Sequence, residues 1–246
     1  MVSSTSFENA LMSFEISGSG NKSPIVLVPG GLSGWISWKL QAEVLSKNHV
    51  VIRVQLLCMA AAEKNQLPGE GYSLRSETKA LKNTLDKLNI RKVNLVGYAH
   101  GGAVSLDFAL EYPNLINTLT LIGPSAYWVA RAYRKFQEEE QRLARSLKGL
   151  HYPVTEDDLI RFVKMNHLVP EGVDPRTVSR WPAWNSLKIS LLTLNTAIEH
   201  SDDLARLKVL SVIPVLLVKG RDSTGFYSGI AGLLSKSIGP SAKVIT

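Results

Sequence analysis

The stretch of sequence that decides the fold is VNLVGYAHGG, residues 93–102. An apolar run typical of a buried strand meets a cluster of small residues, and a helical pattern follows from residue 103. In that setting the spacing G-x-S-x-G places a nucleophilic serine on the turn, but Ala99 occupies the serine position. The stretch therefore predicts a sharp strand-to-helix turn whose apex carries no hydroxyl.

Short apolar runs alternate with amphipathic segments on both sides of this turn. The apolar runs predict strands, beginning with an edge strand, over residues 11–17, 24–28, 50–57, 93–97, 119–124, 213–220 and 242–246. Helical patterns cover residues 76–90, with Ser76 as the cap, and residues 103–112 and 226–238. This alternation predicts an α/β fold, a mostly parallel central sheet flanked by helices.

The pattern changes to polar and helical between residues 125 and 209. A helical insertion after a central strand belongs at the carboxyl edge of the sheet, where open α/β sheets bind their ligands. We therefore expect one structural unit, with a core formed by residues 1–124 and 210–246 and a helical lid formed by residues 125–209.

Composition limits the classes of function. Hydrophobic residues make up 45% and charged residues 20%, which is enough for a core without disulfides or structural metals. The single Cys58 and the lack of a signal-peptide pattern predict a cytoplasmic protein, and no apolar run is long enough to cross a bilayer. The net charge of +7 lacks interleaved aromatic residues, so it predicts a solvated basic surface rather than a nucleic-acid site. The sequence also lacks H-E-x-x-H and G-x-G-x-x-G, and we expect neither a metal nor another cofactor.

Five features in this order resemble the α/β-hydrolase superfamily: VLVPGG (residues 26–31), GYAHGG (97–102), LTLIGP (119–124), the helical insertion and IPVLLVKGRD (213–222). The resemblance implies a strained, positive-φ residue at position 99. Gly97 and Gly101 would leave room for the neighbouring strand and helix, and Gly102 would extend that room.

The resemblance also assigns roles around the turn. The backbone N–H groups of His100 and Gly31 would bind an oxyanion, and the His100 side chain would belong to the pocket rather than act as the general base. Asp222 stands where the triad acid follows the nucleophile in chain order, with a turn or helix cap as the alternative.

No histidine follows Asp222 in the sequence: the five are His49, His100, His151, His167 and His200. The resemblance places the triad histidine in a loop after the last strand, and this chain ends at Thr246, where that strand closes. We expect the histidine in a segment beyond residue 246, with a relocated base at His200 or His167 as the alternative.

The expected activity is hydrolysis of a carboxylic ester, thioester or lactone through an acyl-enzyme, impaired here because Ala99 replaces the nucleophilic serine. The expected partner is a small hydrophobic molecule, with no nucleic acid and no membrane, and the sequence sets no oligomeric state. Expected substrate contacts are Gly30, Leu32, Tyr98, Trp128, Trp181 and Trp184, with core packing as the alternative for the tryptophans.

Three alternatives stay open. The chain could be a natural binding protein on a hydrolase scaffold, or a lyase, cyclase or isomerase that uses the oxyanion donors without acylation. It could also descend from an epoxide or haloalkane hydrolase with aspartate at position 99.

Overall fold

The computed structural model describes residues 7–246 and contains a seven-stranded sheet of order β1-β3-β2-β4-β5-β6-β7. The strands are β1 (Ser13–Ser17), β2 (Ile25–Val28), β3 (Val51–Gln55), β4 (Val93–Tyr98), β5 (Ile116–Ile122), β6 (Val215–Val218) and β7 (Ala242–Ile245). Edge strand β1 pairs antiparallel with β3, and every other pair is parallel. The predicted mostly parallel α/β sheet and its edge strand are confirmed.

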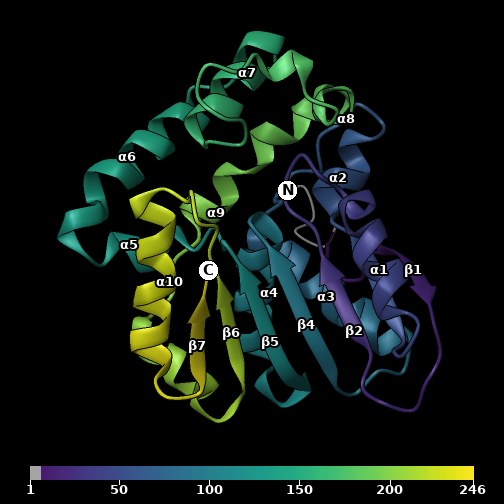
Figure 1. The fold of residues 1–246 in the computed structure, drawn as a ribbon. Coiled ribbons are helices and arrows are strands. Elements are labelled where there is room, and N and C mark those ends of the chain that lie inside the picture. Colours follow the sequence, from purple (N-terminus) through teal and green to yellow (C-terminus); the bar gives the residue numbers. More distant parts are fainter. Residues whose placement is uncertain (1–6) are drawn as a thin grey trace.

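Helices lie around the sheet and at the carboxyl ends of its strands. The α-helices are α1 (Lys39–Leu45), α2 (Leu57–Ala62), α3 (Leu74–Lys87), α4 (His100–Glu111), α5 (Tyr127–Arg131), α6 (Arg134–Lys148), α7 (Glu156–Met165), α8 (Trp181–Ser186), α9 (Asn195–Glu199) and α10 (Gly225–Ile238). Short 3-10 helices are η1 (Trp35–Trp38), η2 (Pro113–Leu115), η3 (Pro175–Thr177), η4 (Lys188–Thr193) and η5 (Leu204–Val212). Helices α6 to α9 of residues 125–209, here called the insertion, lie above the carboxyl ends of the strands (Figure 1).

The two faces of the sheet pack against different helices. Val26 and Val28 of β2 belong to the main core, which also contains buried residues of α3, α4 and α10. Leu27 between them belongs to a second cluster with Trp38 and Ala42, from η1 and α1. Successive strand residues point to opposite faces, so a strand that packs on both sides is apolar throughout.

Helix α3 begins earlier than its sequence pattern predicts. The N-cap is Ser73, not Ser76, because the Ser73 hydroxyl accepts the Ser76 N–H at 3.3 Å while the Ser76 hydroxyl accepts the Ser73 N–H at 3.1 Å. Ser76 is thus the third helical residue of a reciprocal capping box. Two serines three residues apart both fit the N-cap pattern, and the backbone conformation selects the first.

Residues 50–57 were expected to form one strand, but β3 ends at Gln55 and α2 starts at Leu57. The buried Glu77 carboxylate of α3 accepts the Leu57 N–H at 2.8 Å and the Cys58 N–H at 3.0 Å. These bonds satisfy amides that a helix leaves unpaired in its first turn. A cap supplied from 20 residues away has no local sequence signal.

Across residues 7–246, the structure contains no helix that is both long enough and apolar enough to span a membrane.

Candidate active site

Ala99 forms the apex of the turn between β4 and α4. Its φ of 49° and ψ of −112° lie in a region that residues with a side chain rarely adopt. Hydrogen bonds fix this conformation: the Ala99 N–H donates to the Ile122 carbonyl at 2.9 Å, and the Ala99 carbonyl accepts the N–H groups of Ala103 (3.1 Å) and Ser125 (3.0 Å). The positive φ expected at position 99 is present, and β5 and α4 hold the apex from two sides.

Two glycines leave room for this turn. A Cβ on Gly97 would lie 2.3 Å from the Ser105 hydroxyl and 2.5 Å from the Gly101 carbonyl oxygen. A Cβ on Gly101 would lie 2.2 Å from the Pro29 carbonyl oxygen, at the end of β2. Both contacts are far shorter than van der Waals distances, so the turn packs against its neighbours only with glycine at these positions.

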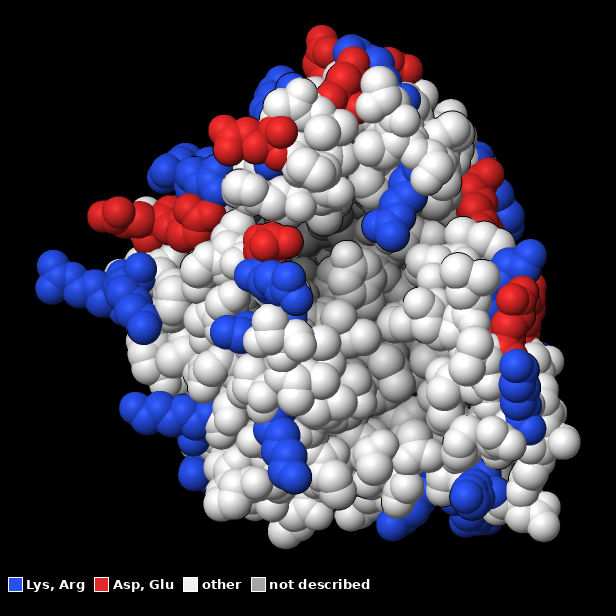
Figure 2. Space-filling view, in the orientation of Figure 1, with Lys and Arg blue, Asp and Glu red and all other residues white. Residues whose placement is uncertain are grey.

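A cavity of about 750 Å³ separates the turn from the insertion. Figure 2 shows the surface hollowed below the insertion, with mostly uncharged walls. Seven of the predicted site residues line the cavity: Gly31, Leu32, Tyr98, Ala99, His100, Trp184 and Asp222. Gly30 adjoins them, because a Cβ there would lie 2.9 Å from the Tyr98 ring and 3.4 Å from the Ala99 Cβ.

The other two predicted tryptophans are not among the residues that line the cavity. Trp128 of α5 is buried, with its ring edge-on to the His200 ring at 6.5 Å. Trp181 is buried at the start of α8. Their positions agree with the packing alternative, since large aromatic side chains commonly fill a core.

Two backbone amides at the cavity wall have no internal acceptor. Within residues 7–246, the N–H groups of Gly31 and His100 form no hydrogen bond. Gly31 follows β2 and His100 begins α4, where the helix dipole adds positive potential. Two such amides, one of them at a helix start, suit an oxygen that gains negative charge.

The His100 side chain is buried at 3% exposure, and neither ring nitrogen has a hydrogen-bond partner among the described residues. Burial lowers the pKa of His100 to about 4, because the interior disfavours the charged imidazolium. The ring is therefore neutral at pH 7 and a weak base. The pocket role of the His100 side chain stays a prediction.

The lowered pKa of His100 predicts a loss of stability in acid. The unfolded chain takes up a proton near pH 6.5, whereas the native His100 stays neutral down to about pH 4. The free energy of unfolding should fall by about 3 kcal/mol across that window from this residue alone. Urea denaturation at pH 7, 5.5 and 4 should show a shallower decline for His100→Gln. The exposed His151→Gln is the control and should follow the parent, while a parallel decline in His100→Gln would contradict the assignment.

The two histidines considered as relocated bases occupy different places. His167, just after α7, lines the cavity, as does Asp222 in the turn after β6. His200 instead pairs with Asp107 on α4, and it is not among the cavity-lining residues. Of these two histidines, only His167 therefore faces the space in front of Ala99.

A polar wall of the cavity was missed by sequence reasoning. The Tyr227 hydroxyl of α10 donates to Asn166 Oδ1 at 2.8 Å and lies 3.1 Å from the Tyr127 hydroxyl of α5. Burial raises the pKa of both tyrosines, so both stay protonated at neutral pH. Arg180 and Arg221 also line the cavity, and neither forms an ion pair within residues 7–246. These residues come from separate elements, and no spacing in the sequence joins them.

The chain belongs to the alpha/beta hydrolase fold family, whose family model matches residues 23–234. One similar relative, the 2-hydroxy-6-oxo-2,4-heptadienoate hydrolase of Pseudomonas putida, is 34% identical over 109 residues, which is 43% of this chain and 38% of that protein. A putative carbamate hydrolase RutD of Azorhizobium caulinodans is 25% identical over 94% of this chain and 84% of its own length. The match to the first relative thus spans well under half of that protein.

Solved structures show the same fold. A hydrolase from Pseudomonas aeruginosa superposes with a TM-score of 0.74 at 20% identity, covering 95% of this chain and 84% of that one. An alpha/beta hydrolase from Sphaerobacter thermophilus gives a TM-score of 0.68 at 22% identity, covering 95% and 87%. The family match and these structures agree on the alpha/beta hydrolase fold.

Proposed function

We propose that this protein is a serine-type hydrolase of carboxylic esters, thioesters or lactones that works through an acyl-enzyme. With Ala99 in place of the serine, the chain binds its substrate but does not hydrolyse it. The observation that carries the proposal is the strained apex at Ala99, which lines the same cavity as two unpaired amides. A strained backbone at a cavity wall costs free energy that a structural turn has no need to store.

Each residue near the apex has a role in this proposal. A serine hydroxyl at position 99 would pass its proton to the His167 imidazole and attack the substrate carbonyl, and the alcohol would leave with that proton as the acyl-enzyme forms. The Gly31 and His100 amides would stabilise the oxyanion, at about 3 kcal/mol for such donors. Asp222 would hold an imidazole in the correct tautomer. Leu32, Tyr98 and Trp184 would contact the apolar part of the substrate.

The binding half of the proposal can be tested on the chain with Ala99. Because Trp38 and Trp184 line the cavity, a nitrophenyl group bound there should quench tryptophan fluorescence. We expect saturable quenching by 4-nitrophenyl butyrate. Ala183→Phe, which narrows the cavity, should weaken binding about tenfold, a loss of about 1.4 kcal/mol.

The matched control is Ala205→Phe, an exposed position on η5 away from the cavity, and it should bind as the parent does. Equal affinity of Ala183→Phe and the parent would place the probe outside the cavity and reject the proposed site.

A second candidate is hydrolysis of a substrate that carries a carboxylate, including cleavage of a carbon–carbon bond. Arg180 and Arg221, which form no ion pair within residues 7–246, favour it from the cavity wall, because an unpaired guanidinium binds carboxylates strongly. The name of the Pseudomonas putida relative specifies such an anionic substrate. In the same titration, mono-4-nitrophenyl succinate should then bind more tightly than the butyrate, and Arg180→Met should remove that preference. Equal binding of both esters would favour the neutral substrate.

A further inference from the structure

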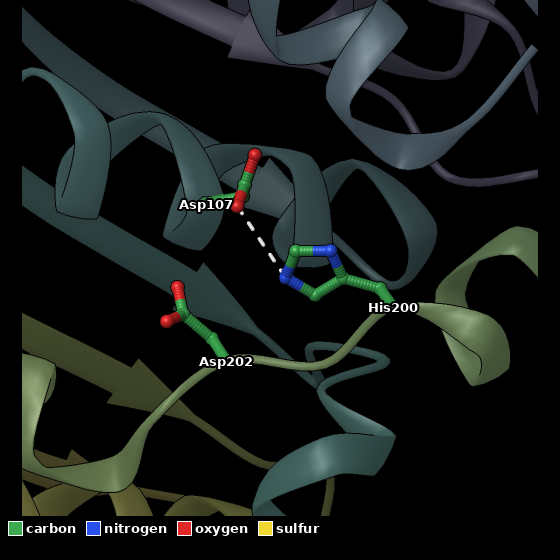
Figure 3. A group of neighbouring side chains, drawn as sticks. All are labelled: Asp107, His200 and Asp202. Carbon is green, nitrogen blue, oxygen red and sulfur yellow. Dashed lines mark ion pairs between the residues drawn. The ribbon is translucent and has the colours of Figure 1, made fainter.

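The insertion returns to the core through a short segment, residues 200–203, between α9 and η5. His200 ends α9 and points at Asp107 of α4, with Asp202 beside them (Figure 3). His200 Nε2 lies 3.3 Å from Asp107 Oδ1, and the two side chains are 6% and 1% exposed. The buried contact between His200 and Asp107 therefore joins the insertion to α4, the helix that starts just after Ala99.

The three side chains could in principle hold a metal, since their ligand atoms lie within 4.8 Å of one another. Arginines already neutralise the carboxylates, however. Arg206 donates to Asp202 at 2.6 Å, and an Arg75 nitrogen lies 3.7 Å from Asp107 and 3.8 Å from Asp202. A dication here would face two guanidinium groups, so we interpret the group as an ionic network.

Within this network, two atoms of the Asp107–His200 contact lack a hydrogen bond in the described part of the chain. The Thr78 hydroxyl donates to Asp107 Oδ2 at 2.7 Å, but Asp107 Oδ1 and His200 Nε2 form no hydrogen bond within the described chain, and the Arg75 nitrogen at 3.7 Å faces the same Oδ1. Burial lowers the pKa of His200 and raises the pKa of Asp107. The 3.3 Å approach of His200 Nε2 to Asp107 Oδ1 is a buried electrostatic contact rather than a hydrogen bond. Glu111 forms ion pairs with Arg75 and Arg206, so it also contributes to the charges around Asp107 and His200.

Helix α9 connects this contact to the cavity. Ala197 of α9 and Leu194, its N-cap, both line the cavity. The Leu194 side chain packs against Gly31 in the loop after β2, because a Cβ on Gly31 would lie 2.5 Å from Leu194 Cδ2. One short helix therefore carries the His200 contact at its end and the Gly31 contact at its start.

We propose that His200 is a positioning residue, which holds α9 on α4 through Asp107 and thereby seats Leu194 against Gly31, fixing the wall beside the oxyanion amides. The proposal uses the cavity of the proposed function, but the contact itself exists without a ligand. Removal of the imidazole takes away the buried contact that joins the end of α9 to Asp107, so α9 should separate from α4 before the rest of the fold opens.

The test measures hydrogen exchange by mass spectrometry in the ligand-free chain together with the affinity for 4-nitrophenyl butyrate. His200→Leu should speed exchange about tenfold in residues 188–199 and in residues 30–34, and should weaken binding about tenfold. His200→Gln keeps a polar side chain that can reach Asp107 and should restore both. Glu199→Gln, at the exposed neighbouring residue, is the matched control and should change neither.

Two results would overturn the inference. One is unchanged exchange in residues 30–34 of His200→Leu. The other is a uniform rise that includes β4 and α3, which would make His200 a general stability residue. If the parent chain fails to bind the ester, the proposed function fails, and the exchange pattern still decides the role of His200.

Discussion

Replacing Ala99 by serine should convert this chain from a binder into an acylating protein. The new hydroxyl would stand at a strained apex in the cavity that the Gly31 and His100 amides also line, with His167 in the same cavity to accept its proton. Attack on an activated ester then gains both positioning and oxyanion stabilisation. We expect Ala99→Ser to release a burst of up to one equivalent of 4-nitrophenol from 4-nitrophenyl butyrate, at least about 100-fold faster than the parent chain. Stopped-flow absorbance measures the burst, and intact mass spectrometry detects the butyryl adduct.

The matched control for this experiment is Ala183→Ser, which adds a hydroxyl to the same cavity away from the apex and should release no burst. Equal rates from Ala99→Ser and the parent would reject the acyl-enzyme mechanism. If Ala99→Ser binds the ester but stays unacylated, the alternatives of a binding protein or a non-hydrolytic catalyst gain support.

Substitution of Gly101 should have the largest effect on stability. In Gly101→Ala the new Cβ would meet the Pro29 carbonyl oxygen at 2.2 Å and the Val28 carbonyl oxygen at 2.7 Å. Both are backbone atoms at the end of a central strand, so neither can move aside as the end of a side chain can. We expect a loss of about 3 kcal/mol in the free energy of unfolding, measured by urea denaturation at pH 7.

Gly232→Ala is the matched control for Gly101→Ala. Gly232 also lies in a helix, α10, but a Cβ there would meet no atom within 4 Å. This variant should be about 1 kcal/mol more stable than the parent, because alanine favours the helix. A Gly101→Ala variant as stable as the parent would contradict the close packing of the turn against the end of β2.

The sequence predicted the fold from information that is local. Strands buried on both faces must be apolar throughout, as β2 is, and a strained turn between strand and helix needs small residues at fixed offsets. The alternation of these features along the chain predicted the sheet, and the resemblance to the α/β-hydrolase superfamily implied the positive φ of Ala99 and most of the cavity residues near it. The end of β3 at Gln55 could not be predicted for the opposite reason, because the cap that starts α2 comes from Glu77, 20 residues further along the chain.

The roles of side chains in the insertion were decided by the tertiary structure alone. Trp128, Trp181 and Trp184 look alike in sequence, but only Trp184 lines the cavity. His200 and His167 were equal candidates for a relocated base, yet one pairs with Asp107 and the other faces the cavity. Tyr127, Tyr227 and Asn166 meet from three helices without any shared motif.

The sequence by itself thus determined the sheet and the apex at position 99, because steric limits on the backbone act between residues a few positions apart. The direction of each side chain from the insertion depends on how short helices pack against one another and on the core. That packing is set by contacts between distant residues, and only the folded chain contains them.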